Sequence, residues 1–112
     1  MKYEMLIHVK PGYFESMAED ERKAISAEYM ALAEDPAARG GAQLQGTETV
    51  TTVRVRDGQT LTTDGPYADT KEVLAGFYVF EAENLDQAIE LAARIPAARL
   101  DGAIEVRPVV ER

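Results

Sequence analysis

The stretch Leu74 to Glu81, LAGFYVFE, decides how this chain folds. It is short, bounded by polar residues and rich in aromatic side chains, which is typical of a buried strand. Successive side chains of a strand point to opposite faces, and here both faces are largely apolar. One face carries Leu74, Tyr78 and Phe80, and the other carries Ala75, Phe77 and Val79. Leaving either face in water would expose a hydrophobic patch, so we expect both to be covered.

The segments before this strand predict a strand, a helix and a hairpin. Residues 2–9 alternate, with Tyr3, Met5, Ile7 and Val9 on one apolar face. Ser16 and Glu19 have the spacing of a capping box and predict the start of an amphipathic helix. Asp35-Pro36 disturbs that helix, and Gly40-Gly41 ends the segment. Residues 42–50 then predict a weaker strand, and Asp57-Gly58 predicts a tight turn in a hairpin over 51–63.

A second helix and a last strand follow. Asn84 is a capping residue for a helix that Pro96 stops, and residues 103–110 predict the final strand. The residues of this helix that we expect to be buried are Leu85, Ala88, Ile89, Ala92 and Ile95. The order β-α-β-(hairpin)-β-α-β predicts an α+β fold of the ferredoxin-like split βαβ type with an inserted β-hairpin, in one domain over 1–112. Right-handed crossovers put both helices on one face of the sheet. Because the other face would be bare, we expect a homodimer with a barrel-like interior.

Composition excludes several classes of function. A net charge of −8 repels phosphate backbones and anionic membrane surfaces, so no nucleic-acid or membrane partner is expected. The absence of cysteine excludes disulfides and thiolate catalysis, and a single histidine, His8, excludes a histidine-rich metal site in one chain. We therefore expect no metal and no cofactor. Residues 1–10 read as a strand rather than a signal peptide, which predicts a cytoplasmic protein.

Polar residues gather directly before the central strand. Asp64, Tyr67, Lys71 and Glu72 surround the turn at Gly65-Pro66. A rigid turn at a sheet edge holds such side chains where small-molecule sites often form. Asp64 is a candidate general base, or orients His8, and an imidazole moves protons at physiological pH. Tyr67, Lys71 and Glu72 are candidate ligand-binding residues, with Lys71 suited to an anionic ligand. Each also has a structural interpretation, as a turn residue, a strand residue or a surface ion pair.

The same motif carries a resemblance to a known family. Asp64-Gly65-Pro66-Tyr67, followed by Thr70-Lys71-Glu72 and Gly76-Phe77, resembles the DGPF-domain, YCII-related family. Residues 1–3, 84–88 and 104–108 are similar as well, so the likeness extends over nearly the whole chain. Two departures are visible: Tyr67 stands where the family usually has phenylalanine, and Asp69 where a glutamate is common.

The resemblance implies a dimeric α+β barrel whose cleft holds a candidate His–Asp pair. Asp64 matches the acidic residue of the motif, and His8 matches the histidine more loosely. A related branch contains enzymes acting on muconolactone-type lactones, and DGPF members are often associated with alternative sigma factors. Two functions therefore stay open: a small-molecule enzyme of the isomerase, lyase or dehalogenase kind using His8 and Asp64, or a non-catalytic ligand-binding or regulatory module. An oxygen- or haem-handling barrel is permitted by the fold class and required by no residue.

Overall fold

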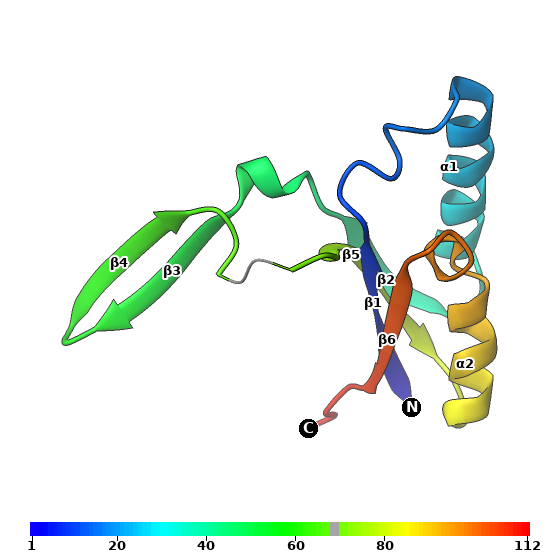
Figure 1. The fold of residues 1–112 in the computed structure, drawn as a ribbon. Coiled ribbons are helices and arrows are strands. Elements are labelled where there is room, and N and C mark those ends of the chain that lie inside the picture. The colour runs from blue at the N-terminus through cyan, green and yellow to red at the C-terminus, as the bar shows by residue number, and fades with distance from the viewer. Residues whose placement is uncertain (68–69) are drawn as a thin grey trace.

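The computed structural model describes residues 1–67 and 70–112. Among these residues, four strands form one antiparallel sheet in the order β2-β5-β1-β6. The strands are β1 (Lys2–Val9), β2 (Ala38–Gln43), β5 (Val73–Glu81) and β6 (Ala103–Pro108). Helices α1 (Glu19–Ala33) and α2 (Leu85–Ala93) both lie against the same face of this sheet (Figure 1). The predicted ferredoxin-like order is therefore confirmed.

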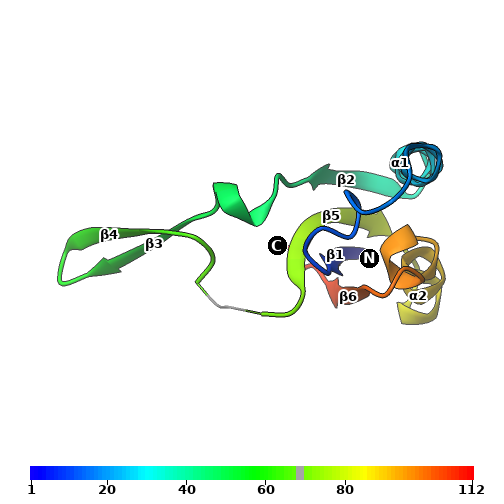
Figure 2. The same cartoon turned by 45° about the horizontal axis from the view of Figure 1, so that its top comes forward.

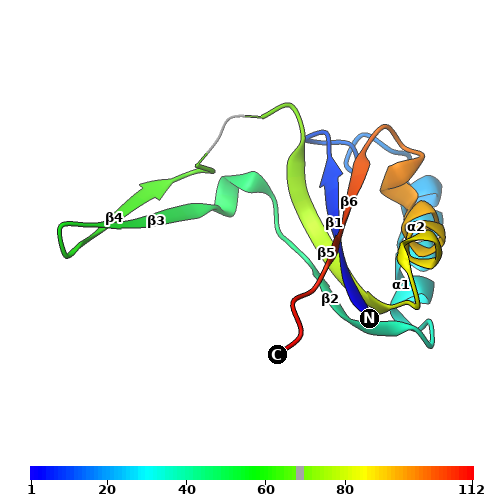
Figure 3. The same cartoon turned by 90° about the horizontal axis from the view of Figure 1, so that it is seen from below.

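The hydrophobic core lies between this sheet and the two helices. The predicted apolar face of β1 is buried there, and its register places Tyr3 beside Phe80 and Met5 beside Tyr78. Phe80 and Met5 are fully buried. The alternate residues of these strands, among them Leu6 and Phe77, point to the opposite face. Leu74, predicted to share a face with Tyr78 and Phe80, lies on this opposite face instead, because the register of β1 and β5 shifts between Ile7 and His8. That open face is uncovered by the part of the chain that the structure describes (Figure 3).

The predicted capping box at the start of α1 is wrong. The helix begins at Glu19 with Ala18 as its N-cap, and no side chain caps it. The hydroxyl of Ser16 donates instead to the carbonyl oxygen of Tyr13, inside a turn that precedes the helix. The Ser16 hydroxyl thus bonds to the backbone of a local turn. Serine commonly makes such turn contacts in place of capping a helix.

The strand predicted over residues 42–50 starts earlier than expected. β2 begins at Ala38 and includes Gly40 and Gly41, and Thr47–Thr49 form a short 3-10 helix, η1. Gly41 is needed because β5 passes close to this strand: a Cβ on Gly41 would lie 2.6 Å from the carbonyl oxygen of Phe77. The second glycine of a pair that resembles a stop signal is here an adaptation to close strand packing.

The second helix follows its prediction only in part. Asn84 caps α2 by accepting a hydrogen bond from the backbone N–H of Gln87, and Ala88 and Ala92 are buried as expected. Leu85 and Ile89, predicted to be buried, are about half exposed. Leu91 takes the place expected of Ile89 in the core.

The predicted hairpin is present, but it stands apart from the sheet. β3 (Thr51–Arg56) and β4 (Gln59–Asp64) form a separate two-stranded sheet joined at Asp57-Gly58, where both residues have positive φ. We call residues 51–64 the arm. The arm projects well beyond the four-stranded sheet, as Figures 1 and 2 show from two directions.

Candidate functional site

His8 lies near the end of β1 on the open face of the sheet. Its register partners are Leu74 on β5 and Ala103 on β6. The imidazole Nε2 lies 2.5 Å from Oε1 of Glu105, and the His8 side chain is 25% exposed. The distance is within hydrogen-bonding reach, although the angle is not that of an aligned hydrogen bond, so Nε2 counts as buried and unpaired by geometry. We call these two contacting side chains the His8–Glu105 pair.

Asp64 is not beside His8 within one chain. It is the last residue of β4 and pairs with Thr51 across the arm, whereas His8 belongs to the four-stranded sheet. Figures 1 and 3 show β4 and β1 well apart. The two residues therefore meet only if the Asp64 of another copy approaches His8.

The other predicted ligand-binding residues lie in the segment between the arm and β5. Tyr67 is 81% exposed, Lys71 is exposed and Glu72 is half-buried. Glu72 acts electrostatically on Lys10: the pKa of Lys10 is raised mainly by its hydrogen bond to Asp101 and, to a smaller extent, by Glu72. Asp69, the second acid of the motif, lies outside the described residues.

A large open cavity lies beside β2 and β5, and His8 is not among the residues that line it. It has a volume of about 1010 Å³ and is bordered by α1, β2, the start of β5 and residues 10–15. Ile7 and Val9 of β1 line it, as do Leu74 and Phe77 of β5, whereas His8 does not border it. Other side chains in its wall are Phe14, Met30, Leu44 and Val73. The cavity is suited to an apolar ligand.

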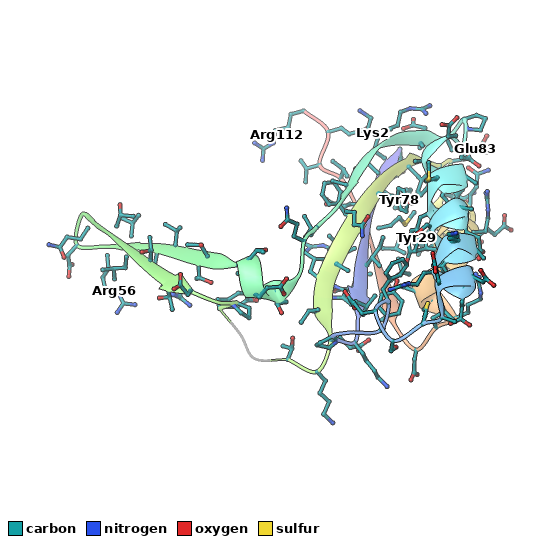
Figure 4. The ribbon with its side chains drawn as sticks, turned by 90° about the horizontal axis from the view of Figure 1, so that it is seen from above. Lys2, Tyr29, Arg56, Tyr78, Glu83 and Arg112 are labelled. Carbon is teal, nitrogen blue, oxygen red and sulfur yellow. The ribbon has the colours of Figure 1, made fainter. Side chains whose placement is uncertain are left out.

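Three tyrosines supply polar groups to this cavity. The hydroxyl oxygens of Tyr13 and Tyr29 lie 3.1 Å apart in a hydrogen bond, and the Tyr78 hydroxyl donates to the Tyr29 carbonyl oxygen at 2.7 Å. Tyr29 and Tyr78 lie side by side between α1 and β5 (Figure 4). Burial, with the Tyr13 hydrogen bond second, raises the pKa of Tyr29, and burial raises that of Tyr78. Both side chains stay neutral phenols at physiological pH.

Glu105 and the tyrosines of the cavity were missed from the sequence. Glu105 is found only by combining the strand order, which sets β6 beside β1, with the register that pairs Leu6 with Glu105. The tyrosines come from three elements far apart in the chain and resemble ordinary core residues. In the described part of the chain, no three His, Cys, Asp or Glu side chains gather as a metal site, and no helix has the length and apolarity of a membrane span.

The sequence profile of the YCII-related domain matches residues 1–112. The chain belongs to the YCII-related family. An uncharacterized protein of Rhizobium meliloti (strain 1021) is 41% identical over 69 residues, which are 61% of this chain and 56% of that protein. The match therefore spans little more than half of that relative's length.

Among solved structures, the chain is similar to the 5-chloro-2-hydroxyhydroquinone dehydrochlorinase TftG from Burkholderia phenoliruptrix AC1100, in complex with 2,5-dihydroxybenzoquinone. The similarity covers 100% of this chain and 96% of TftG, with a TM-score of 0.60 and 17% identity. The similarity supports the mixed α+β fold of this YCII-related protein.

Proposed function

We propose that this YCII-related protein is a small-molecule enzyme of the isomerase, lyase or dehalogenase kind, which uses acid–base chemistry without a cofactor. The observation that carries the proposal is the His8–Glu105 pair on the open face of the sheet. A carboxylate beside an imidazole orients the ring, and an imidazole is the side chain that most often acts as a general acid–base group. The TftG structure adds support at the level of the fold, because a related architecture there holds a small ring compound.

In this proposal each predicted site residue has a role. His8 moves the proton, and Asp64 of a second copy supplies a further carboxylate in a cleft between two subunits. Tyr67, Lys71 and Glu72 bind the ligand at the edge of that cleft, with Lys71 holding an anionic group. The support for a dimer is the open face itself, where Leu6, Phe77 and Val79 are only half-buried in one chain. A cytoplasmic location stays a prediction from the sequence.

The test is turnover of a panel of small lactones, carboxylates and chlorinated hydroquinones by wild type, His8→Gln and Asp64→Asn. Loss of a general acid–base group lowers the turnover rate by about 100-fold or more, while ligand affinity stays within a few fold. Glu111→Gln, which removes an exposed carboxylate near the C-terminus, is the matched control and should retain full turnover. A compound turned over equally well by wild type and His8→Gln would contradict the proposed role of His8.

The cavity favours a second candidate function, non-catalytic binding of a small apolar ligand. Its wall combines apolar side chains with tyrosine hydroxyls, and His8, the proposed acid–base group, is not among the residues that line it. Such a site can bind a ligand without proton transfer by His8. A regulatory module associated with alternative sigma factors, as the resemblance implies, would use it in this way. Binding without turnover across the panel, weakened by Tyr29→Phe and unchanged in His8→Gln, would favour this function over the enzyme.

A further inference from the structure

Within the part of the chain that the structure describes, the arm has no core. Nearly every residue of β3 and β4 is exposed, including Val53 at 58% and Val55 at 70%. An isolated two-stranded hairpin is at best marginally stable in water, and exposed valines add no stability to it. A hairpin of this kind is expected to pack against another surface.

One face of the arm is suited to such a contact, and it includes Asp64. The β3–β4 register pairs Val53 with Thr62, Val55 with Thr60 and Thr51 with Asp64, which places these six residues on one face. The opposite face carries Arg54, Arg56 and Leu61. The first face, which we call the valine face, carries two valines and three threonines, all β-branched, and ends in the carboxylate of Asp64.

The chain itself supplies a surface of complementary character. On the open face of the sheet Leu6 pairs with Phe77 and His8 pairs with Leu74, so an apolar stripe runs up to the imidazole. Leu6 and Phe77 are half-buried, and Leu74 is 42% exposed. The valine face and this stripe match in chemistry, and each has a charged or polar group, Asp64 or His8, at one end.

Electrostatics favours the arm as the contact between two copies. Within residues 51–64 the charges of Arg54 and Arg56 balance those of Asp57 and Asp64, so the net charge of −8 belongs to the rest of the chain. Two bodies of like charge repel, whereas a neutral arm approaches an acidic body without that penalty. Each strand of the arm has six residues and is about 20 Å long, which is enough to reach across a neighbouring subunit.

We propose that the arm of one copy packs its valine face on the open sheet face of a second copy and brings Asp64 to that copy's His8. With two-fold symmetry each subunit gives one arm and receives one, so the assembly closes as a dimer. The functional role of this contact rests on the proposed function, because Asp64 then completes an acid–base site that one chain leaves incomplete. The occupant of the open face is thus a second copy of this chain.

The absence of cysteine from the chain allows a direct test with introduced thiols. His8→Cys and Asp64→Cys proteins are purified separately, mixed, allowed to exchange subunits and oxidised. A disulfide forms only when the two Cα atoms come within about 7 Å, so the mixture should yield a covalent species of twice the 12.3 kDa chain mass. Thr63→Cys, whose position adjoins Asp64 but faces the other side of the arm, is the matched control and should cross-link about tenfold less.

The outcomes separate this inference from the proposed function. Equal cross-linking of positions 63 and 64, or none at either, would overturn the packing of the arm. If His8→Cys does not fold, Ala103→Cys takes its place, because Ala103 is exposed and pairs with His8 on the same face. Loss of turnover in His8→Gln without any cross-link would agree with the proposed function and refute only the proposed packing of the arm. Cross-linking with undiminished turnover in His8→Gln would establish the packing of the arm and refute the proposed role of His8.

Discussion

Val53 and Asp64 lie on the same face of the arm, because Thr51 pairs with Asp64 and Val53 follows two residues along β3. The apolar contact surface and the proposed carboxylate are therefore presented together. Any partner that covers the valine also receives the acid. The sheet on which this face would dock has its own apolar stripe beside His8. The β3–β4 register places Asp64 beside the docking residues of the arm, and the β1–β5 register places His8 beside the apolar stripe.

Val53→Lys should weaken the dimer without unfolding the chain. The side chain is 58% exposed in one subunit, so the substitution costs little there, but it places a charge in the proposed interface. Because burial of a valine is worth about 1.5–3 kcal/mol, the dissociation constant should rise about tenfold or more in sedimentation experiments. Gln59→Lys makes the same change in charge on the opposite face and should leave it unaltered. Equal effects of the two variants would contradict the assigned face.

Phe77 and Tyr78 are neighbours whose replacement should have different consequences. Tyr78 is 8% exposed and packs against α1, so Tyr78→Lys puts a charge in the core and should unfold the protein. Phe77 points to the open face, so Phe77→Lys should give a folded monomer. Thermal melting by circular dichroism and light scattering distinguish the two results. A folded Tyr78→Lys protein beside an unfolded Phe77→Lys protein would mean that the faces are reversed.

Tyr29 should control ligand binding in the cavity rather than turnover. Its hydroxyl bonds to that of Tyr13 at the cavity wall, and Tyr29→Phe removes it with little change in volume. The loss of one hydrogen bond to a bound oxygen is worth about 1 kcal/mol, so affinity should fall about fivefold in calorimetry. Phe14→Leu changes an apolar part of the same wall and is the control for packing alone. An unchanged affinity in Tyr29→Phe would place the ligand elsewhere.

Asp35 should make the stability of the fold dependent on acid pH. The pKa of Asp35 is lowered, first by the hydrogen bond that its carboxylate accepts from the backbone N–H of Ala37 and then by Arg94. A carboxyl whose pKa is lower in the folded than in the unfolded state stabilises the protein. This stabilisation is fully present when the pH is above the pKa of the unfolded carboxyl, about 3.9. This contribution is lost as the pH falls through the folded pKa.

Urea unfolding of wild type and Asp35→Asn measures this contribution. The wild type should be more stable by about 1 kcal/mol at neutral pH, and the difference should shrink as the pH falls below about 4. Asp86→Asn, which alters an exposed carboxylate in the first turn of α2, is the control. A difference that grew on acidification would have the wrong sign for a lowered pKa.

Local patterns in the sequence predict most of the fold because they act over few residues. The alternation of Tyr3, Met5 and Ile7 predicts which face of β1 is buried, and Asp57-Gly58 predicts the hairpin turn. The errors occur where a residue has two local uses. Ser16 caps a turn instead of the helix, and Gly41 allows close strand packing instead of ending a segment.

The site is less predictable because it depends on register and on packing between distant elements. The side of β1 to which His8 points follows from alternation, but Glu105 becomes its neighbour only through the pairing of β1 with β6. Turn chemistry predicts that β3 pairs with β4 and carries no information on where the pair lies. The separation of Asp64 from His8 within one chain is therefore not predictable from the motif.

Subunit complementation tests most directly whether one site is built from two copies. His8→Gln and Asp64→Asn proteins, each inactive alone on a compound that the wild type turns over, are mixed and allowed to exchange subunits. In a mixed dimer the arm of the His8→Gln subunit brings an intact Asp64 to the intact His8 of its partner. Random pairing then restores about a quarter of the wild-type turnover, since half of the dimers are mixed and each has one complete site. A mixture that stays as inactive as its two components would contradict a site shared between subunits.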